Sequence, residues 1–197
     1  MRIDRLEIPA DRNLRNFEID FDERAPMTVL LGSNGSGKSN LIENLVEIFL
    51  ALEKGQVPSF KYAMTYYCHQ KRIEVEADPQ AKKSPLRVKV DGKSVSAKAF
   101  KDKASEYLPA HIFAYYSGTN SRLERLFAEP TKRYYKNNLN ETRGHSNADS
   151  AGLRRFFLCR KEYGELAFLS LFFEDSEFAR FIRNERILNL LNRRCLF

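Results

Sequence analysis

The sequence lacks tryptophan, has only three cysteines and contains no apolar run that approaches the length of a membrane span. Cys68, Cys159 and Cys195 are widely spaced and form no C-x-x-C pair, so we expect neither a disulfide framework nor a zinc site. The longest apolar stretch, residues 166–173, is far shorter than the ~20 residues that cross a bilayer. The N-terminal residues show no signal-peptide pattern. These absences favour a protein of the reducing cytoplasm.

The composition is that of a globular protein with an excess of positive charge. Hydrophobic residues make up 43% of the 197 residues, which is enough for one substantial core. Lys and Arg outnumber Asp and Glu by 33 to 26, giving a formal net charge of +7. Such a balance favours a polyanionic partner, either nucleic acid or nucleotide, although many basic proteins bind neither.

The most informative segment is residues 32–39, Gly-Ser-Asn-Gly-Ser-Gly-Lys-Ser, which fits the phosphate-binding pattern G-x-x-x-x-G-K-[ST]. Its glycines allow the backbone to curl so that successive N–H groups face a triphosphate. We expect Lys38 to reach the β- and γ-phosphates of ATP and the Ser39 hydroxyl to ligate Mg²⁺. The predicted nucleotide-binding residues are Gly32, Ser33, Asn34, Gly35, Ser36, Gly37, Lys38, Ser39 and Asn40.

The segments on either side of this loop suit phosphate binding. Residues 27–31 are apolar with a β-branched centre and predict a buried strand. Residues 39–54 have helical spacing of apolar positions and are followed by Gly55 and Pro58, which end helices. A helix N-terminus adds partial positive charge to an anion site, so strand, loop and helix together predict a nucleotide site.

The rest of the chain divides into strand patterns followed by helical patterns. Alternating residues predict strands at 2–8, 16–21, 72–77 and 86–90, with a further strand after the turn at Asp91-Gly92, and another at 110–116. Ser121 is expected to cap a helix. The polar residues 137–152 predict a mobile loop, and residues 153–197 have a helical pattern.

Residues 15–21 and 28–43 together resemble the N-terminal lobe of ABC-type ATPase heads. Within that group, Gly-Ser-Asn-Gly-Ser-Gly-Lys-Ser-Asn followed by Leu-Ile-Glu is similar to the RecF and SMC branch, whose loops commonly read G-x-N-G-x-G-K-S-N. The resemblance is clear over residues 1–53, and the strands between 72 and 95 fit the antiparallel subdomain less specifically. Stand-alone AAA-type ATPases of DNA repair and antiphage defence share this plan.

The resemblance implies an α/β fold: a P-loop NTPase N-terminal lobe of ABC-ATPase type, followed by a helical region. A mixed sheet surrounds the loop helix, and a small antiparallel sheet lies beside it. The implied domains are residues 1–120 for the lobe and 121–197 for the helical region. ATP and Mg²⁺ are the implied cofactors. The implied partners are a second ATPase head or a second copy of the chain, with DNA or a partner protein; no membrane is implied.

The second half of such a head is not evident in the sequence. A signature loop of L-S-G-G type, an apolar strand ending in Asp-Glu and a switch histidine all fail to stand out. Glu174 and Asp175 follow an apolar run and are the candidate catalytic acids, but their helical surroundings favour a buried helix with a polar last turn. We therefore expect the N-terminal portion of an ATPase, which binds ATP and hydrolyses it when a partner or further chain completes the site.

Gln70 is a candidate second magnesium ligand, because the glutamine that many ABC heads carry near the strand at 110–116 is not found there. Glu43 matches the family pattern, but we expect it to serve packing or solvation and not catalysis.

Basic side chains suggest where DNA could bind. Lys132, Arg133 and Lys136 are interleaved with two tyrosines, a combination that suits phosphate contact and base stacking. An amphipathic helix with inward-facing tyrosines explains the same pattern. Arg12 and Arg15 lie where related heads place basic residues near nucleotide or DNA.

Two other functions use the same loop. A small phosphotransferase, such as a nucleotide kinase, needs an acceptor site that the sequence does not reveal. A non-catalytic module that binds nucleotide or a partner protein fits the absence of the second acidic strand. Dependence of ATP hydrolysis on Lys38 would exclude the non-catalytic module.

Overall fold

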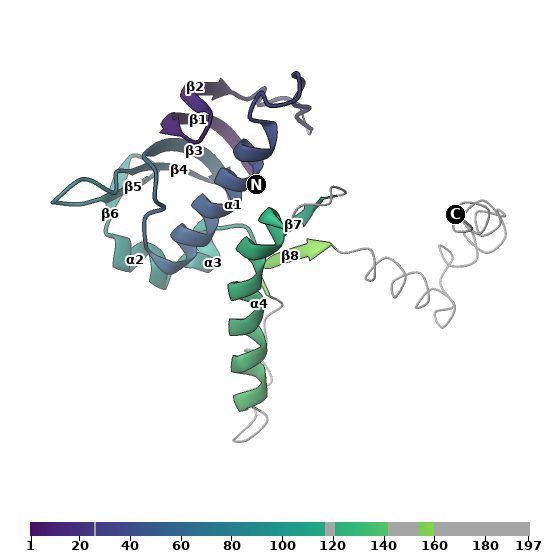
Figure 1. Cartoon of the computed structure of the whole chain (residues 1–197). Coiled ribbons are helices and arrows are strands. Elements are labelled where there is room, and N and C mark those ends of the chain that lie inside the picture. The colour runs from purple at the N-terminus through teal and green to yellow at the C-terminus, as the bar shows by residue number, and fades with distance from the viewer. Residues whose placement is uncertain (26, 117–120, 142–153, 160–197) are drawn as a thin grey trace, which may run out of the picture. The chain divides into compact units, whose positions relative to one another are not determined.

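The computed structural model describes residues 1–25, 27–116, 121–141 and 154–159 (Figure 1). The chain divides into two compact units. The first consists of Met1–Ile112 and Asn120–Phe156, and the second of Phe113–Thr119 and Phe157–Phe197.

A six-stranded sheet in the order β2-β1-β3-β4-β5-β6 forms the centre of the first unit. All five neighbouring pairs are antiparallel. The strands are β1 (Arg2–Asp11), β2 (Leu14–Asp20), β3 (Tyr62–Cys68), β4 (Lys71–Ala77), β5 (Leu86–Val90) and β6 (Lys93–Val95). The expected mixed sheet and separate antiparallel sheet are therefore, in the described residues, one antiparallel sheet, because β3 pairs with both β1 and β4.

One face of the sheet is apolar and is covered by α1 (Lys38–Lys54), as Figure 1 shows. Along β3 the buried residues alternate with more exposed ones, so every second side chain points to the helix side. Phe49 of α1 meets Tyr66 of β3 edge to face, with ring centroids 5.6 Å apart. The helix ends where Gly55 adopts a left-handed conformation with a φ of 66°, as the sequence predicted.

Two short helices pack at the end of this core that is drawn lowest in Figure 1. Helix α2 (Ala97–Asp102) begins at Ser96, whose hydroxyl accepts a hydrogen bond from the backbone N–H of Ala99. Helix α3 (Ala104–Tyr107) follows directly, and the Tyr107 carbonyl accepts a hydrogen bond from the Tyr66 hydroxyl at 3.0 Å. The largest fully buried side chains, which make up the core, include Leu6, Ile8, Ile48, Leu52, Tyr62, Tyr66, Ile73, Val75, Phe100 and Leu108.

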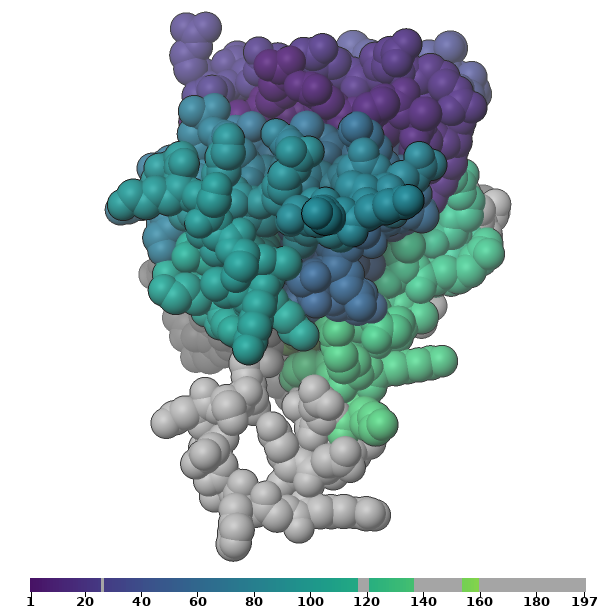
Figure 2. All heavy atoms as spheres, turned by 90° about the vertical axis from the view of Figure 1, so that its left-hand side faces the viewer, coloured from purple at the N-terminus to yellow at the C-terminus, as the bar shows by residue number. Residues whose placement is uncertain are grey.

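The edge strand β6 has only three residues and begins with the exposed Lys93. Figure 2, in which the left-hand side of Figure 1 faces the viewer, shows the teal residues of this part of the chain on the surface. A short edge strand with charged side chains is a poor template for pairing with another sheet.

Residues 27–31 do not form the buried strand that their composition predicts. They lie in no strand of the described chain, and Met27, Val29 and Leu31 are 74%, 68% and 90% exposed. Their prediction as a buried strand was wrong for this structure: a strand needs neighbours for its hydrogen bonds, and the described sheet ends at β2 and β6 without including them.

Helix α4 (Arg122–Glu141) follows Ser121, where the sequence predicted a helix start. It continues five residues into the predicted loop at 137–152, and residues 142–152 lie outside the described residues. Ion pairs to Glu43, Lys54 and Glu53 of α1 hold α4 against that helix.

Strands β7 (Ile112–Tyr115) and β8 (Phe156–Cys159) form a two-stranded sheet. A helical pattern was expected for 153–197, and the strand at β8 corrects it. The Ile112 N–H donates to the Arg155 carbonyl at 2.6 Å, and Phe113 stacks on Phe157 at 5.0 Å. The pairing of β7 with β8 therefore stabilises a strand where the local sequence pattern predicts a helix. Glu174, Asp175 and Cys195 lie outside the described residues.

No helix in the described ranges is long and apolar enough to span a membrane.

Cys68 at the end of β3 provides a chemical test of this core. Its side chain is 3% exposed, and burial raises the pKa of its thiol. Because the thiolate is the reactive form, we expect Cys68 to resist iodoacetamide in the folded protein, whereas the half-buried Cys159 reacts faster. Mass spectrometry of peptides alkylated with and without urea measures this difference. Equal labelling of both cysteines without urea would contradict the placement of β3.

Candidate functional site

The loop at 32–39 turns sharply because two of its glycines have left-handed backbones. Gly35 and Gly37 have φ values of 84° and 100°. At Gly37 an added Cβ would lie 2.7 Å from Leu14 Cδ2, a buried atom at the start of β2. Only glycine therefore allows the loop to pass this close to the β1–β2 turn.

Helix α1 begins at this loop with its N-terminal charge uncompensated by side chains. Gly37 is the N-cap, no side chain caps the helix, and the first turn contains no acidic residue. The first backbone N–H groups of a helix have no intrahelical partner, and the helix dipole favours an anion beside them. The start of α1 is thus suited to bind a phosphate group.

Lys38 lies within the curve of the loop. Its Nζ donates to the carbonyl oxygens of Gly32 at 2.6 Å and Ser33 at 2.8 Å. A third contact joins Nζ to Ser36 Oγ at 3.4 Å. The loop thus holds the ammonium group at its centre, on the side that borders a cavity of about 320 Å³.

Seven consecutive loop and helix residues line this cavity together with two residues from elsewhere in the chain. The lining consists of Asn13, Asn34, Gly35, Ser36, Gly37, Lys38, Ser39, Asn40 and Arg122. The sequence predicted Asn34 to Asn40. Gly32 and Ser33, also predicted, contribute the carbonyls that hold Lys38.

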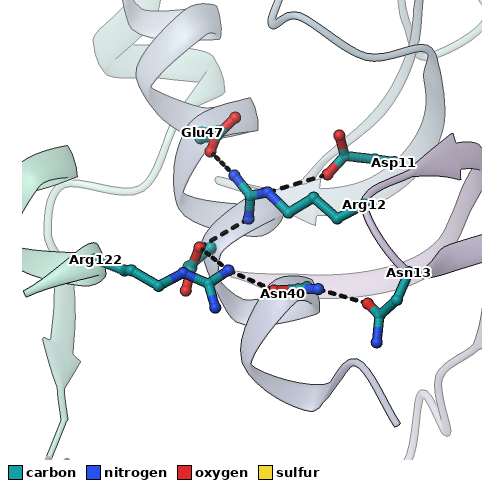
Figure 3. A network of polar contacts seen from close by, with 7 residues as sticks. Asp11, Arg12, Asn13, Asn40, Glu47 and Arg122 are labelled. Carbon is teal, nitrogen blue, oxygen red and sulfur yellow. Dashed lines mark hydrogen bonds and ion pairs between the residues drawn. The ribbon is translucent and has the colours of Figure 1, made fainter. Parts of the chain in front are cut away.

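A chain of side-chain amides connects the loop to the β1–β2 turn and to α4 (Figure 3). Asn13 donates to the Gly35 carbonyl at 2.6 Å and accepts from Asn40 at 2.5 Å. The Asn40 amide oxygen accepts in turn from Arg122 Nη2 at 2.5 Å. These bonds hold the tip of the loop against the β1–β2 turn and α4, neither of which is adjacent to it in the sequence.

Glu43, on the next turn of α1, is held by two arginines. Its side chain is buried, and its Oε2 accepts from Arg12 at 2.7 Å and from Arg122 at 2.9 Å. Arg12 also donates to Glu47 at 2.6 Å and faces Asp11 (Figure 3). A buried carboxylate requires such partners, because desolvation without them costs several kcal/mol, of order 3–5 when a pair is broken. Glu43 thus holds the side chains of Arg12 and Arg122 beside α1.

Not all predicted basic and polar candidates reach the cavity. Arg12 lies beside α1 in the Glu43 network, whereas Arg15 is exposed on β2. Gln70 occupies the two-residue turn between β3 and β4, next to the end of β1 that pairs with Tyr67. Asn13 follows the opposite end of the ten-residue β1, about 30 Å away at ~3.3 Å per residue. The structure thus does not bring Gln70 to the loop.

The DNA-binding candidates lie on α4. Lys132 and Lys136 are exposed, and Tyr135 between them is 54% exposed. Arg133 is half-buried and pairs with Glu53 of α1. Two of the three basic candidates therefore point to solvent, and the third fastens α4 to α1.

Sequence reasoning missed Asn13 and Arg122 as cavity residues. Asn13 lies in a turn, and Arg122 is 82 positions from its partner Asn40. No motif spacing connects such distant residues. The sequence shows only that Arg122 is a basic residue next to the predicted helix start at Ser121.

The residues present fit a nucleoside triphosphate with Mg²⁺. The curved loop, the uncapped helix start and Lys38 would hold the phosphates, and the Ser39 hydroxyl would ligate the metal. Mg²⁺ bound there neutralises charge on the phosphates. Among the described residues, no group of three His, Cys, Asp or Glu side chains forms a separate metal site.

These features fit nucleotide phosphates at the start of a helix. A family model described as an AAA ATPase domain matches residues 1–185. The chain therefore belongs to the AAA ATPase domain family, and membership implies nucleotide binding with ATPase activity, typically with Mg²⁺. A search among curated proteins finds no match.

Proposed function

We propose that this chain binds ATP and Mg²⁺ at the loop of residues 32–39 and serves as a head of a RecF/SMC-like ATPase. The observation that carries the proposal is Lys38 at the centre of a glycine loop that opens an uncapped helix. Family membership supports the ATPase class. The antiparallel sheet beside the loop is consistent with the N-terminal lobe of such a head.

Hydrolysis in this proposal requires groups from outside the described loop. Lys38, Ser39 and the loop amides stabilise phosphate charge, but they do not orient an attacking water. The cavity lining contains no carboxylate among the described residues. A second copy of the chain, a second head or further residues supply that group.

The proposed context of the ATPase is DNA, in repair or phage defence. The exposed Lys132, Tyr135 and Lys136 on α4 support a DNA contact, since cations bind phosphates and aromatic rings stack on bases. The formal net charge of +7 supports the same type of partner.

Replacing Lys38 with alanine tests the nucleotide site. Loss of a charge-assisted contact is expected to weaken ATP binding by about 1.5–3 kcal/mol, roughly 10- to 150-fold. Isothermal titration of the full chain with Mg-ATP measures the change. Lys98→Ala, which removes an exposed lysine on α2, is the control for net charge and should bind as the parent does.

The same two variants separate turnover from binding. A steady-state ATPase rate in the parent that disappears in Lys38→Ala supports an active head, and stimulation of that rate by DNA supports the proposed context. Unchanged ATP affinity in Lys38→Ala would refute the assignment of the site.

A further inference from the structure

Arg122 reaches the phosphate cavity from a distant part of the chain. It is the first residue of α4, and it lines the cavity beside Lys38 and Ser39. Its side chain is 40% exposed, so a ligand in the cavity can reach the guanidinium group. Arg122 therefore places a second basic side chain beside the loop.

Arg122 reaches from α4 to α1 at the residue beside the expected magnesium ligand. Its Nη2 contacts Asn40 Oδ1, and Asn40 directly follows Ser39, the expected magnesium ligand. Ser39 would hold Mg²⁺ beside the β- and γ-phosphates, and the loop amides would cradle the α- and β-phosphates. Arg122 thus contacts the residue next to the expected metal ligand, and a metal held there would neutralise the terminal phosphates.

Glu43 keeps a second positively charged partner if Arg122 leaves it to contact a phosphate. The buried carboxylate accepts from Arg122 at 2.9 Å and from Arg12 at 2.7 Å. If Arg122 turns toward a phosphate, Arg12 still neutralises Glu43. No buried charge is then left without a partner, which is the costly outcome when an ion pair breaks.

We propose that Arg122 binds the γ-phosphate of a nucleoside triphosphate and that Glu43 holds the guanidinium at the cavity when no triphosphate is bound. The planar guanidinium can donate two parallel hydrogen bonds to phosphate oxygens. A diphosphate lacks the group that Arg122 contacts. The pair therefore distinguishes ATP from ADP, an inference that rests on the proposed nucleotide site.

The test compares affinities for Mg-ATP and Mg-ADP in the full-length chain, measured by isothermal titration. Arg122→Gln is expected to weaken ATP binding by about tenfold, the loss of one charge-assisted contact, while ADP affinity stays close to that of the parent. Arg125→Gln is the matched control, because Arg125 lies on the same helix, is exposed and does not line the cavity. It should leave both affinities unchanged.

A second variant distinguishes the loss of a phosphate contact from a general loss of structure. Arg122→Lys keeps a positive charge for Glu43 but not the planar fork, so its ATP-to-ADP affinity ratio should fall between those of the parent and Arg122→Gln. A structural role alone would lower both affinities together and leave the ratio as in the parent.

The outcomes for Arg122 and Lys38 are distinguishable. If Lys38→Ala loses ATP binding but both Arg122 variants keep the parent's affinity ratio, the γ-phosphate contact is overturned and the site stands. If Lys38→Ala binds ATP as the parent does, the proposed site fails and the inference fails with it.

Discussion

Replacing Gly37 with alanine is expected to abolish measurable ATP binding. Gly37 has a φ of 100°, and an alanine Cβ would lie 2.7 Å from Leu14 Cδ2 and 3.1 Å from Asn13 Oδ1. The left-handed backbone alone costs roughly 1–3 kcal/mol for a residue with a side chain, and the contact adds to this cost. The loop must shift away from the β1–β2 turn, which misplaces Lys38 and the first N–H groups of α1. Titration with Mg-ATP measures the loss.

Gly92→Ala is the control for backbone strain. Gly92 has a φ of 77°, but its added Cβ would meet nothing within 4 Å, and the residue lies in the turn between β5 and β6. We expect a modest loss of stability, about 1 kcal/mol, with ATP binding intact. Normal ATP binding by Gly37→Ala would show that the loop does not need its close approach to Leu14.

Tyr66→Ala is expected to destabilise the first unit by about 3–5 kcal/mol, the range for removing a buried aromatic side chain. Tyr66 is 0% exposed, meets Phe49 of α1 and donates to the Tyr107 carbonyl. Burial raises the pKa of its hydroxyl, so the group remains a donor at ordinary pH. The substitution thus leaves a cavity and an unsatisfied carbonyl where sheet, α1 and α3 meet.

Urea unfolding followed by far-UV circular dichroism measures this loss of stability, because the chain has no tryptophan to report it by fluorescence. Tyr67→Ala is the matched control. Tyr67 is the next residue on β3, points to the other face of the sheet and is 40% exposed. A similar shift of the midpoint for both variants would contradict the assignment of the buried face.

Several elements could be predicted from the sequence because local patterns determine them. In β5 the alternation of Leu86, Val88 and Val90 with two basic residues matches the observed strand at both ends. In α1 the periodic apolar residues and Gly55 define the helix and its end. In each case the side chains that face the core repeat with the period of the element.

Other elements depend on neighbours that the sequence does not identify. Strand β3 was not predicted, because apolar and aromatic residues on both of its faces hide the alternation. Residues 27–31 have the composition of a strand but lack a partner among the described residues. Strand β8 was expected to be helical, and its pairing with β7 decides otherwise.

The candidate site was predictable only where its residues are contiguous. The motif identified the loop and Lys38, since spacing fixes their chemistry. Asn13, Glu43 and Arg122 come from three elements, and their contacts depend on the packing of α1 against the β1–β2 turn and α4. Such contacts follow from the fold and not from spacing.

The strand order also bears on how the chain folds. In the six-stranded sheet, four of the five pairings join strands that are consecutive in the sequence: β1–β2, β3–β4, β4–β5 and β5–β6. The fifth pairing, β1–β3, spans the phosphate loop and α1. Local pairings form fast because they close short loops, whereas a pairing of high contact order forms slowly. We expect the two sets of hairpins to form early and β1–β3 to join them last. The phosphate loop lies inside the segment that this last step closes, so it would take shape late, when the sheet becomes continuous.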